Sequence, residues 1–192
     1  QAALEVREYN YGGSQTDSYA YAPRIGLHWG GRVASQIAIS SNGWINILDN
    51  PGTGYENLRA DNIYALGDVT AYYSDIRLKT VVGSIDNAIE AVKAIDTFKY
   101  RHNETAQQHG FEDDKVHVGV SAQSVEAVLP EVVEHAPFDI ESVDGENTSK
   151  TGEWYKTVKY DKMVPLLIEA IKEQQTMIDE LKQEINKLKG EA

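Results

Sequence analysis

The sequence predicts an α+β fold in two parts: a β-rich segment over residues 1–73 and a mixed α/β segment over residues 74–192 that ends in a long helix. Three observations support this division. The composition changes, because all 12 lysines lie at or after Lys79 and 8 of the 11 tyrosines lie before Ser74. Turn signals alternate with short strand-forming runs in the first part, whereas helical and strand periods alternate in the second. A heptad pattern then occupies about residues 162–189.

The overall composition excludes several classes of function. A chain of 192 residues with 41% hydrophobic and 25% charged residues is typical of globular domains and can bury a core. Its net charge of −12 argues against partners such as nucleic acid or anionic lipid surfaces. Cysteine is absent, which excludes disulfides and thiolate metal sites. No apolar run approaches the roughly 20 residues that span a bilayer, so we expect no membrane insertion.

Residues 1–73 are predicted to form short strands joined by turns. The turn signals are Gly12-Gly13, Gly30-Gly31, Ser41-Asn42-Gly43 and Asp49-Asn50-Pro51-Gly52. The strand-forming residues between them are Ile37, Ile39, Trp44, Ile45 and Ile47. Such short apolar runs make a thin core for a monomer, so we expect strands interleaved between identical chains in an obligate oligomer. Because the chain begins with Gln and lacks the layout of a signal peptide, we also expect a fragment of a longer protein.

Short elements follow one another after Lys79. Ser84 is predicted to cap a helix with apolar residues at helical spacing. The pattern then predicts, in chain order, a strand at 98–100, a polar loop at 103–114, a strand at 116–120, a helix at 122–129 that Pro130 stops, a strand at 131–134, a mobile acidic loop at 136–153 and a strand at 154–160.

The clearest element is a helix over about residues 162–189, about 42 Å long at 1.5 Å per residue. Its heptad positions a and d are predicted to form a coiled coil through Val164, Leu167, Ile171, Gln174, Ile178, Leu181, Ile185 and Leu188. Gln174 is the polar interruption and is expected to fix the register. Ile at a with Leu at d also suits dimers, so the period alone does not establish a trimer. The alternative is an amphipathic helix that packs on its own domain.

Ser74 and Lys79 are the candidate catalytic residues, because a neutral amine can accept the proton of a serine hydroxyl. A free lysine titrates near 10.4, so roughly one molecule in 2,500 would carry the base form at neutral pH. Burial would have to lower that pKa by several units. The spacing alone favours the plainer alternative, a turn followed by solvated charges.

Other candidate sites are weaker. The five histidines have no ligand-like spacing, and the acidic residues around Asp113 lack the alternating oxygen donors of a calcium loop, so we expect no metal and no cofactor. His117 is interpreted as a core or interface residue. Aromatic residues of the first part could stack on sugars or could form an interchain core; they are Tyr9, Tyr11, Tyr19, Tyr21, Trp29, Trp44 and Tyr55. A sugar-processing enzyme is disfavoured, because no carboxylate pair can be placed in so short a segment.

The second part resembles a known family. Residues 74–79 (Ser-Asp-Ile-Arg-Leu-Lys) resemble the opening motif of the endosialidase-type intramolecular chaperone domain, which ends many phage tail fibres and tailspikes. The resemblance continues at residues 119–125, 129–133, 158–160 and 166–173. Residues 25–31 and 68–73 resemble phage tail-fibre tips, especially the L-shaped side fibre of a coliphage.

The resemblance implies a self-cleaving chaperone. Residues 74–192 would form a homotrimer and guide the folding of the upstream fibre segment, their client. The chain would then cut itself between Tyr73 and Ser74, with Ser74 as nucleophile and Lys79 as base, a serine peptidase that turns over once. Asp75 matches the motif, and we expect it to orient the reacting groups.

The same resemblance implies where the parts act. Residues 1–73 would be the end of the fibre and its candidate receptor-binding tip, with bacterial surface polysaccharide as a candidate ligand in host attachment. The fibre would belong to the virion tail, and the chaperone would be made and released in the host cytoplasm. The alternative is a structural trimerisation module that does not cleave itself.

Overall fold

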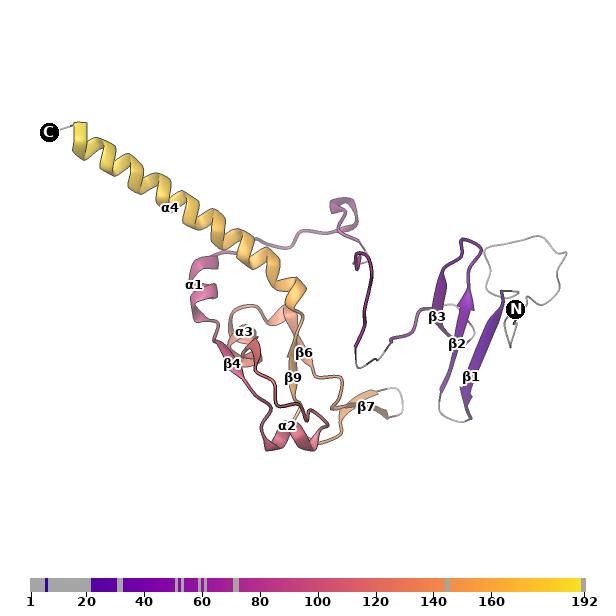
Figure 1. The fold of residues 1–192 in the computed structure, drawn as a ribbon. Coiled ribbons are helices and arrows are strands. Elements are labelled where there is room, and N and C mark those ends of the chain that lie inside the picture. Colours follow the sequence, from indigo (N-terminus) through magenta and orange to yellow (C-terminus); the bar gives the residue numbers. More distant parts are fainter. Residues whose placement is uncertain are drawn as a thin grey trace. The chain divides into compact units, whose positions relative to one another are not determined.

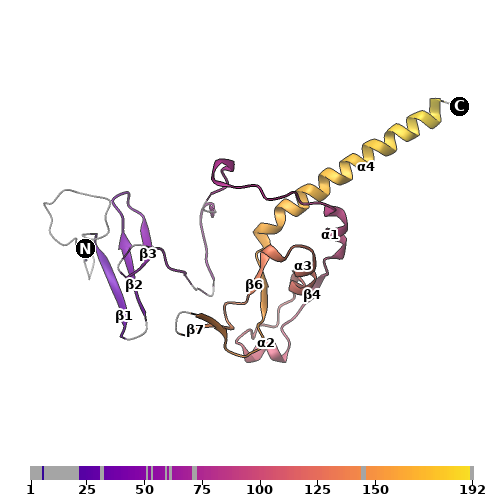
Figure 2. The same cartoon turned by 180° about the vertical axis from the view of Figure 1, so that it is seen from behind.

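The computed structural model describes residues 6, 22–30, 33–50, 52, 54–58, 60, 62–70, 73–143 and 146–190. It divides into two compact units, residues 1–75 and 76–192, each of which is described by itself. The predicted α+β class is confirmed, because strands and helices alternate and the described chain ends in a long helix (Figures 1 and 2). The predicted turn at Gly12-Gly13 lies outside the described residues.

A three-stranded antiparallel sheet forms the first unit. Its strands β1 (Arg24–Trp29), β2 (Val33–Ile39) and β3 (Ile45–Asp49) are neighbours in chain order. The predicted turn between β2 and β3 is confirmed, since the Ser40 N–H donates to the Trp44 carbonyl over 2.9 Å. Gly43 adopts a φ of 84°, a conformation that glycine reaches without strain.

One face of this sheet is buried and partly polar. The register pairs Gln36 with Leu48 and Ala38 with Asn46, and all four side chains are buried. Gln36 accepts a hydrogen bond from the Arg24 guanidinium over 3.0 Å and donates to the Asp49 carbonyl over 3.1 Å. These bonds satisfy the buried amide, so the polar side chain specifies the register of the sheet without an unpaired group.

The opposite face of the sheet is apolar and uncovered in the single chain. Because side chains alternate along a strand, the residues between the buried ones share this face. Its exposed members are Ile25, Leu27, Trp29, Ile37, Ile39 and Ile45. Ile25 pairs with Ile37, and Ile37 with Ile47, so the isoleucines form a continuous row across all three strands. Exposed apolar faces of this kind mark interaction surfaces.

The second unit contains three two-stranded antiparallel sheets, four α-helices and three short 3-10 helices in its described part. The sheets pair β4 (Thr97–Tyr100) with β5 (His117–Val120), β6 (Val133–His135) with β9 (Lys156–Val158), and β7 (Ile140–Val143) with β8 (Glu146–Ser149). The helices are α1 (Ala88–Ala94), α2 (Glu104–Gln108), α3 (Ala122–Val128) and α4 (Val164–Gly190), and the 3-10 helices are η1 (Ile76–Leu78), η2 (Pro130–Val132) and η3 (Tyr160–Met163). Among the described helices, none combines the length and apolar character needed to cross a membrane.

Two small apolar clusters hold this unit together. Ala88 of α1 packs with Leu166 and Ala170 of α4 in the first cluster. Val125, Val132 and Met163 form the second. Ile95 and Leu129 are partly buried against both clusters, so the two form one continuous core at the base of α4.

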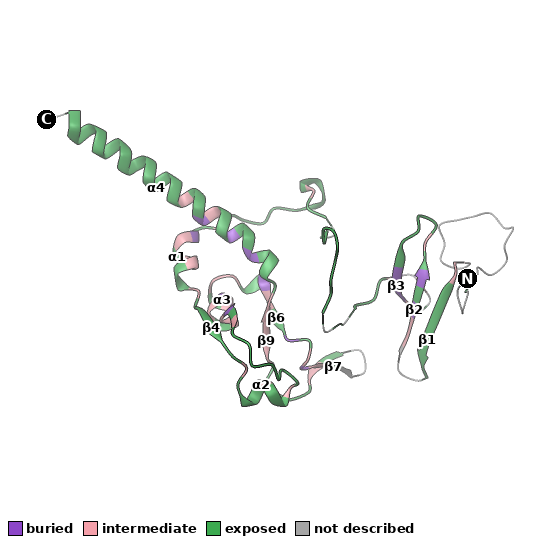
Figure 3. Cartoon of the chain, in the orientation of Figure 1, coloured by how far each residue is buried: buried purple, intermediate pink, exposed green. Residues whose placement is uncertain are grey.

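The long C-terminal helix is confirmed. Helix α4 has 27 residues and, at 1.5 Å per residue, a length of about 40 Å. Its buried side chains, Leu166 and Ala170, lie in the first two turns. Beyond Glu173 every described residue of α4 is exposed, as its green ribbon in Figure 3 shows.

Several predicted boundaries were wrong. Ser84 does not cap α1, because its hydroxyl bonds to Asp86 and the N-cap position is Asn87 with a left-handed φ of 53°. The predicted loop over 103–114 contains α2, whose first turn Asn103 caps by accepting from the Ala106 N–H over 2.9 Å. The predicted strand over 154–160 shortens to β9, because Trp154 has a φ of 54°, outside the range of a strand.

The predicted mobile loop over 136–153 is instead the β7–β8 hairpin organised by Asp139 (Figure 1). The Asp139 side chain is fully buried, and its carboxylate accepts hydrogen bonds from Ser149 Oγ (2.8 Å), Thr151 Oγ1 (2.8 Å), Thr151 N (3.0 Å) and Tyr155 N (3.2 Å). Burial raises the pKa of Asp139, but these hydrogen bonds outweigh it and lower the pKa from 3.8 to about 2. The local sequence looks polar and irregular because several of its polar residues donate hydrogen bonds to this one carboxylate.

Asp139→Asn should destabilise the second unit, because the amide replaces an acceptor oxygen with a donor that faces one hydroxyl group and one backbone N–H. We expect the urea midpoint of the full chain, followed by circular dichroism, to fall at pH 7. The folded-state pKa lies below the unfolded value, so the advantage of the wild type is complete above about pH 4 and lost as the pH falls to about 2. A difference between the two proteins that stays constant from pH 7 to pH 2 would contradict this role for the charge.

Candidate functional site

The predicted cleavage segment spans the point in the sequence at which the chain divides into its two units. Tyr73 and Ser74 are exposed and Asp75 is half-buried, all at the end of the first unit. Lys79 follows η1 in the second unit, where its backbone N–H donates to the Ile76 carbonyl over 3.1 Å. The Lys79 side chain is exposed in the single chain.

Apolar residues around Lys79 are uncovered. Ile76 and Leu78 of η1 are each 65% exposed, Val81 is 72% exposed and Val82 is 97% exposed. Burying such side chains is worth about 1.5–3 kcal/mol each, so their exposure in a single chain is unfavourable. We call Ile76, Leu78, Val81 and Val82 the linker strip. A partner that covered the linker strip would also exclude water from the neighbourhood of Lys79.

The predicted heptad residues lie on the uncovered side of α4. The apolar ones are all exposed by 45% or more: Val164, Leu167, Ile171, Ile178, Leu181, Ile185 and Leu188. Gln174 is also exposed. The residues of α4 that pack on the second unit are Leu166, Ala170 and Glu173, at the helical spacing i, i+4 and i+7. The helix therefore has two separate faces, one bound to its own unit and one apolar face without a cover.

The Glu173 side chain connects α4 to α1 through hydrogen bonds. Its two carboxylate oxygens accept hydrogen bonds from the backbone N–H groups of Ala88 (2.8 Å) and Ile89 (2.9 Å). These N–H groups belong to the first turn of α1, where a helix lacks internal partners and favours negative charge. A side chain 84 residues away in sequence thus replaces the local cap that Ser84 was predicted to supply.

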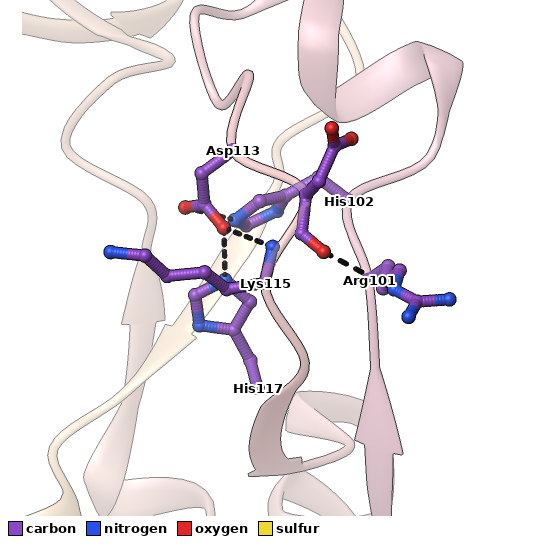
Figure 4. A network of polar contacts seen from close by, with 6 residues as sticks. Arg101, His102, Asp113, Lys115 and His117 are labelled. Atoms are coloured by element: carbon purple, nitrogen blue, oxygen red, sulfur yellow. Dashed lines mark hydrogen bonds and ion pairs between the residues drawn. The ribbon is translucent and has the colours of Figure 1, made fainter.

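The structure also brings together His102, Asp113 and His117, which sequence reasoning treated separately (Figure 4). Asp113 Oδ1 lies 2.9 Å from His117 Nε2, and Asp113 Oδ2 lies 3.6 Å from His102 Nε2. The hydrogen bond with His117 lowers the pKa of Asp113, and the backbone N–H of Lys115 adds to this. The spacing 102, 113, 117 gives no signal, because the β4–β5 pairing and the intervening loop create the cluster.

Comparison with known proteins finds matches to part of the chain. Residues 74–134 match a peptidase family model described as chaperone of endosialidase. The family resemblance is confirmed. The chaperone-of-endosialidase match begins at Ser74 and ends within β6, so α4 lies beyond it. Two curated relatives, the long tail fibre proteins Gp37 of Enterobacteria phages K3 and T2, are each 29% identical over 131 residues, which is 68% of this chain. The matched part covers 9% and 8% of those proteins, so the chain spans less than a tenth of their length.

Removing the contact of Glu173 with α1 should weaken the core of the second unit. Glu173→Ala removes both acceptors from the start of α1, and the loss of a cap costs about 1 kcal/mol. We expect this decrease in the free energy of urea unfolding of the full chain. Glu180→Ala is the matched control, because Glu180 is an exposed glutamate two turns further along α4. Equal stability of the two variants would contradict this role of Glu173.

Proposed function

We propose that the chain is a phage tail-fibre segment joined to an intramolecular chaperone that cleaves itself free. Residues 74–192 would form a homotrimer, guide the folding of the upstream β structure, and separate from it between Tyr73 and Ser74. The observation that carries this proposal is the start of the family match at Ser74, within two residues of the division between the two units. The tail-fibre relatives support the nature of the client and a location in the virion tail.

The proposed reaction needs only the groups at this junction. The neutral amine of Lys79 accepts the proton of the Ser74 hydroxyl, and Ser74 Oγ attacks the carbonyl carbon of Tyr73. The C–N bond breaks as the proton passes to the departing amino group of Ser74, which leaves an ester between Tyr73 and Ser74 Oγ. Water then hydrolyses the ester to the Tyr73 carboxylate and restores the Ser74 hydroxyl. Asp75, half-buried beside the nucleophile, would orient the segment.

Trimer formation would provide the burial that an amine base needs. The linker strip, the apolar face of α4 and the isoleucine face of the β1–β3 sheet are all uncovered in the single chain. Association through these surfaces would bury apolar area in both units and exclude water around Lys79. Cleavage would therefore wait for assembly.

A second candidate is a trimerisation module that does not cleave itself. The exposure of Lys79 in the single chain favours it, because an amine base needs a site from which water is excluded. The two candidates differ in one measurement, the mass of the purified wild-type chain.

Wild-type protein should yield two fragments that meet between Tyr73 and Ser74, as read by intact mass spectrometry. Ser74→Ala and Lys79→Ala should each slow cleavage by about a thousandfold or more, because each removes a group required for attack. Ser84→Ala and Lys93→Ala serve as controls, since Ser84 bonds to Asp86 and Lys93 pairs with Glu90 on the surface. Cleavage at the same bond in Ser74→Ala would overturn the assignment, and an intact wild type would favour the second candidate.

The apolar face of α4 should control both assembly and cleavage. Ile171→Asp with Ile178→Asp places two charges on residues that are 64% and 46% exposed in the single chain, so the monomer should remain folded. We expect light scattering to report monomers and mass spectrometry to report an intact chain. Thr176→Asp with Gln183→Asp, at heptad positions opposite the seam, should remain trimeric and cleave. A monomeric Ile171→Asp, Ile178→Asp variant that still cleaves would break the link between assembly and chemistry.

A further inference from the structure

The end of the β4–β5 hairpin gathers three potential metal ligands. His102 follows β4, His117 opens β5, and Asp113 comes from the loop between them. One ligand atom from each residue can be chosen so that all three lie within 4.8 Å of one another. In Figure 4 the His102 and His117 rings both lie next to the Asp113 carboxylate, and their centroids are 4.7 Å apart. The pairing of Tyr100 with His117 brings His102 and His117 to the same end of the hairpin.

The distances are close to those of a zinc centre. With bonds of roughly 2.0–2.1 Å, the ligand atoms of a tetrahedral zinc ion are about 3.3 Å apart. Asp113 Oδ1 lies 2.9 Å from His117 Nε2, and the other oxygen, Oδ2, lies 3.6 Å from His102 Nε2. One ligand atom from each of the three residues lies within 4.8 Å of the other two. Both histidines present Nε2 to the carboxylate. A small movement of the three side chains would therefore supply three of the four ligands of a tetrahedral ion.

The surroundings hold the ligands in place. The His102 ring stacks on Phe111 at 5.5 Å and meets the edge of Tyr100 at 5.8 Å, and its side chain is 15% exposed. The His117 ring lies 5.3 Å from Tyr100. The Lys115 backbone N–H donates to Asp113 Oδ1 over 2.9 Å, and this hydrogen bond restricts the orientation of the carboxylate. Such outer contacts orient ligands in established metal sites.

We infer that His102, Asp113 and His117 bind one divalent cation of the zinc type, with water completing its coordination. Two imidazoles and one carboxylate suit Zn²⁺, Co²⁺ or Ni²⁺ better than Mg²⁺ or Ca²⁺, which prefer oxygen ligands. The ion would join His102, two residues after β4, to the first residue of β5 and close the loop that carries α2. This revises the expectation of no metal, which rested on spacing alone. The inference does not depend on self-cleavage.

The alternative is a carboxylate that hydrogen bonds to two imidazoles with no ion. In that arrangement the hydrogen bonds among the three side chains require no ion, and added metal shows no saturable binding. The chain offers matched controls, because His135 packs on Trp154 at 4.6 Å and His109 on Phe138 at 5.1 Å, outside the cluster.

The test is to titrate Co²⁺ into the untagged 192-residue chain and to follow binding by visible absorption. The chain carries Ser74→Ala so that it stays intact. We expect one Co²⁺ per chain, displaced by an equal amount of Zn²⁺. His102→Gln, His117→Gln and Asp113→Asn should each weaken binding at least about tenfold, since even losing an outer-shell contact costs 10–100-fold. Asp113→Asn keeps an oxygen for the Lys115 N–H, so circular dichroism should show a folded protein. His135→Gln and His109→Gln should bind as the wild type does. No saturable binding, or equal losses in the control variants, would overturn the site.

Discussion

The attachment of α4 to α1 is the contact on which the second unit depends. Leu166 and Ala170 bury Ala88, and the Glu173 carboxylate satisfies the first N–H groups of α1. The same helix turns its heptad side chains away from the unit, where they are exposed. Because the two faces are separate, the inner one can fix the position of α4 within its own unit while the outer one stays available for other copies of the chain.

Uncovered apolar surface recurs in both units and gives the proposed assembly its physical basis. The β1–β3 sheet buries Gln36, Ala38, Asn46 and Leu48 on one face and exposes isoleucines on the other. The linker strip is exposed beside Lys79, and the heptad face is exposed along α4. Large exposed apolar patches on soluble proteins often mark interaction sites. The proposed association of identical chains would account for all three surfaces.

Regular patterns made much of the fold predictable from the sequence. The isoleucine runs with the Ser41-Asn42-Gly43 turn predicted β2 and β3, and the heptads predicted α4, because local periods determine these elements. The errors have a common cause in long-range contacts. Ser84 carries the right chemistry for a cap, but Glu173 occupies that role from another helix. The 136–153 segment looked disordered because its order comes from one buried carboxylate, Asp139.

The candidate sites also differ in whether the local sequence could predict them. Ser74 and Lys79 could be predicted from the sequence because their motif is contiguous, and their catalytic role remains a prediction; the family match begins at Ser74. The cluster of His102, Asp113 and His117 escaped prediction, since its members meet only after β4 and β5 pair. Spacing rules detect ligands that share one helix or one loop, and they miss ligands that two strand ends and a loop supply together.

The distance in sequence between Ala88 and Glu173 also has a consequence for synthesis on the ribosome. Helix α4 is translated after every other described element, so the core that contains Leu166 and Ala170 cannot close while those elements are emerging. Helix α1 must therefore wait, without its contacts to α4, until that helix has been made. Under the proposed function, this order of translation would keep self-cleavage from starting before α4 exists.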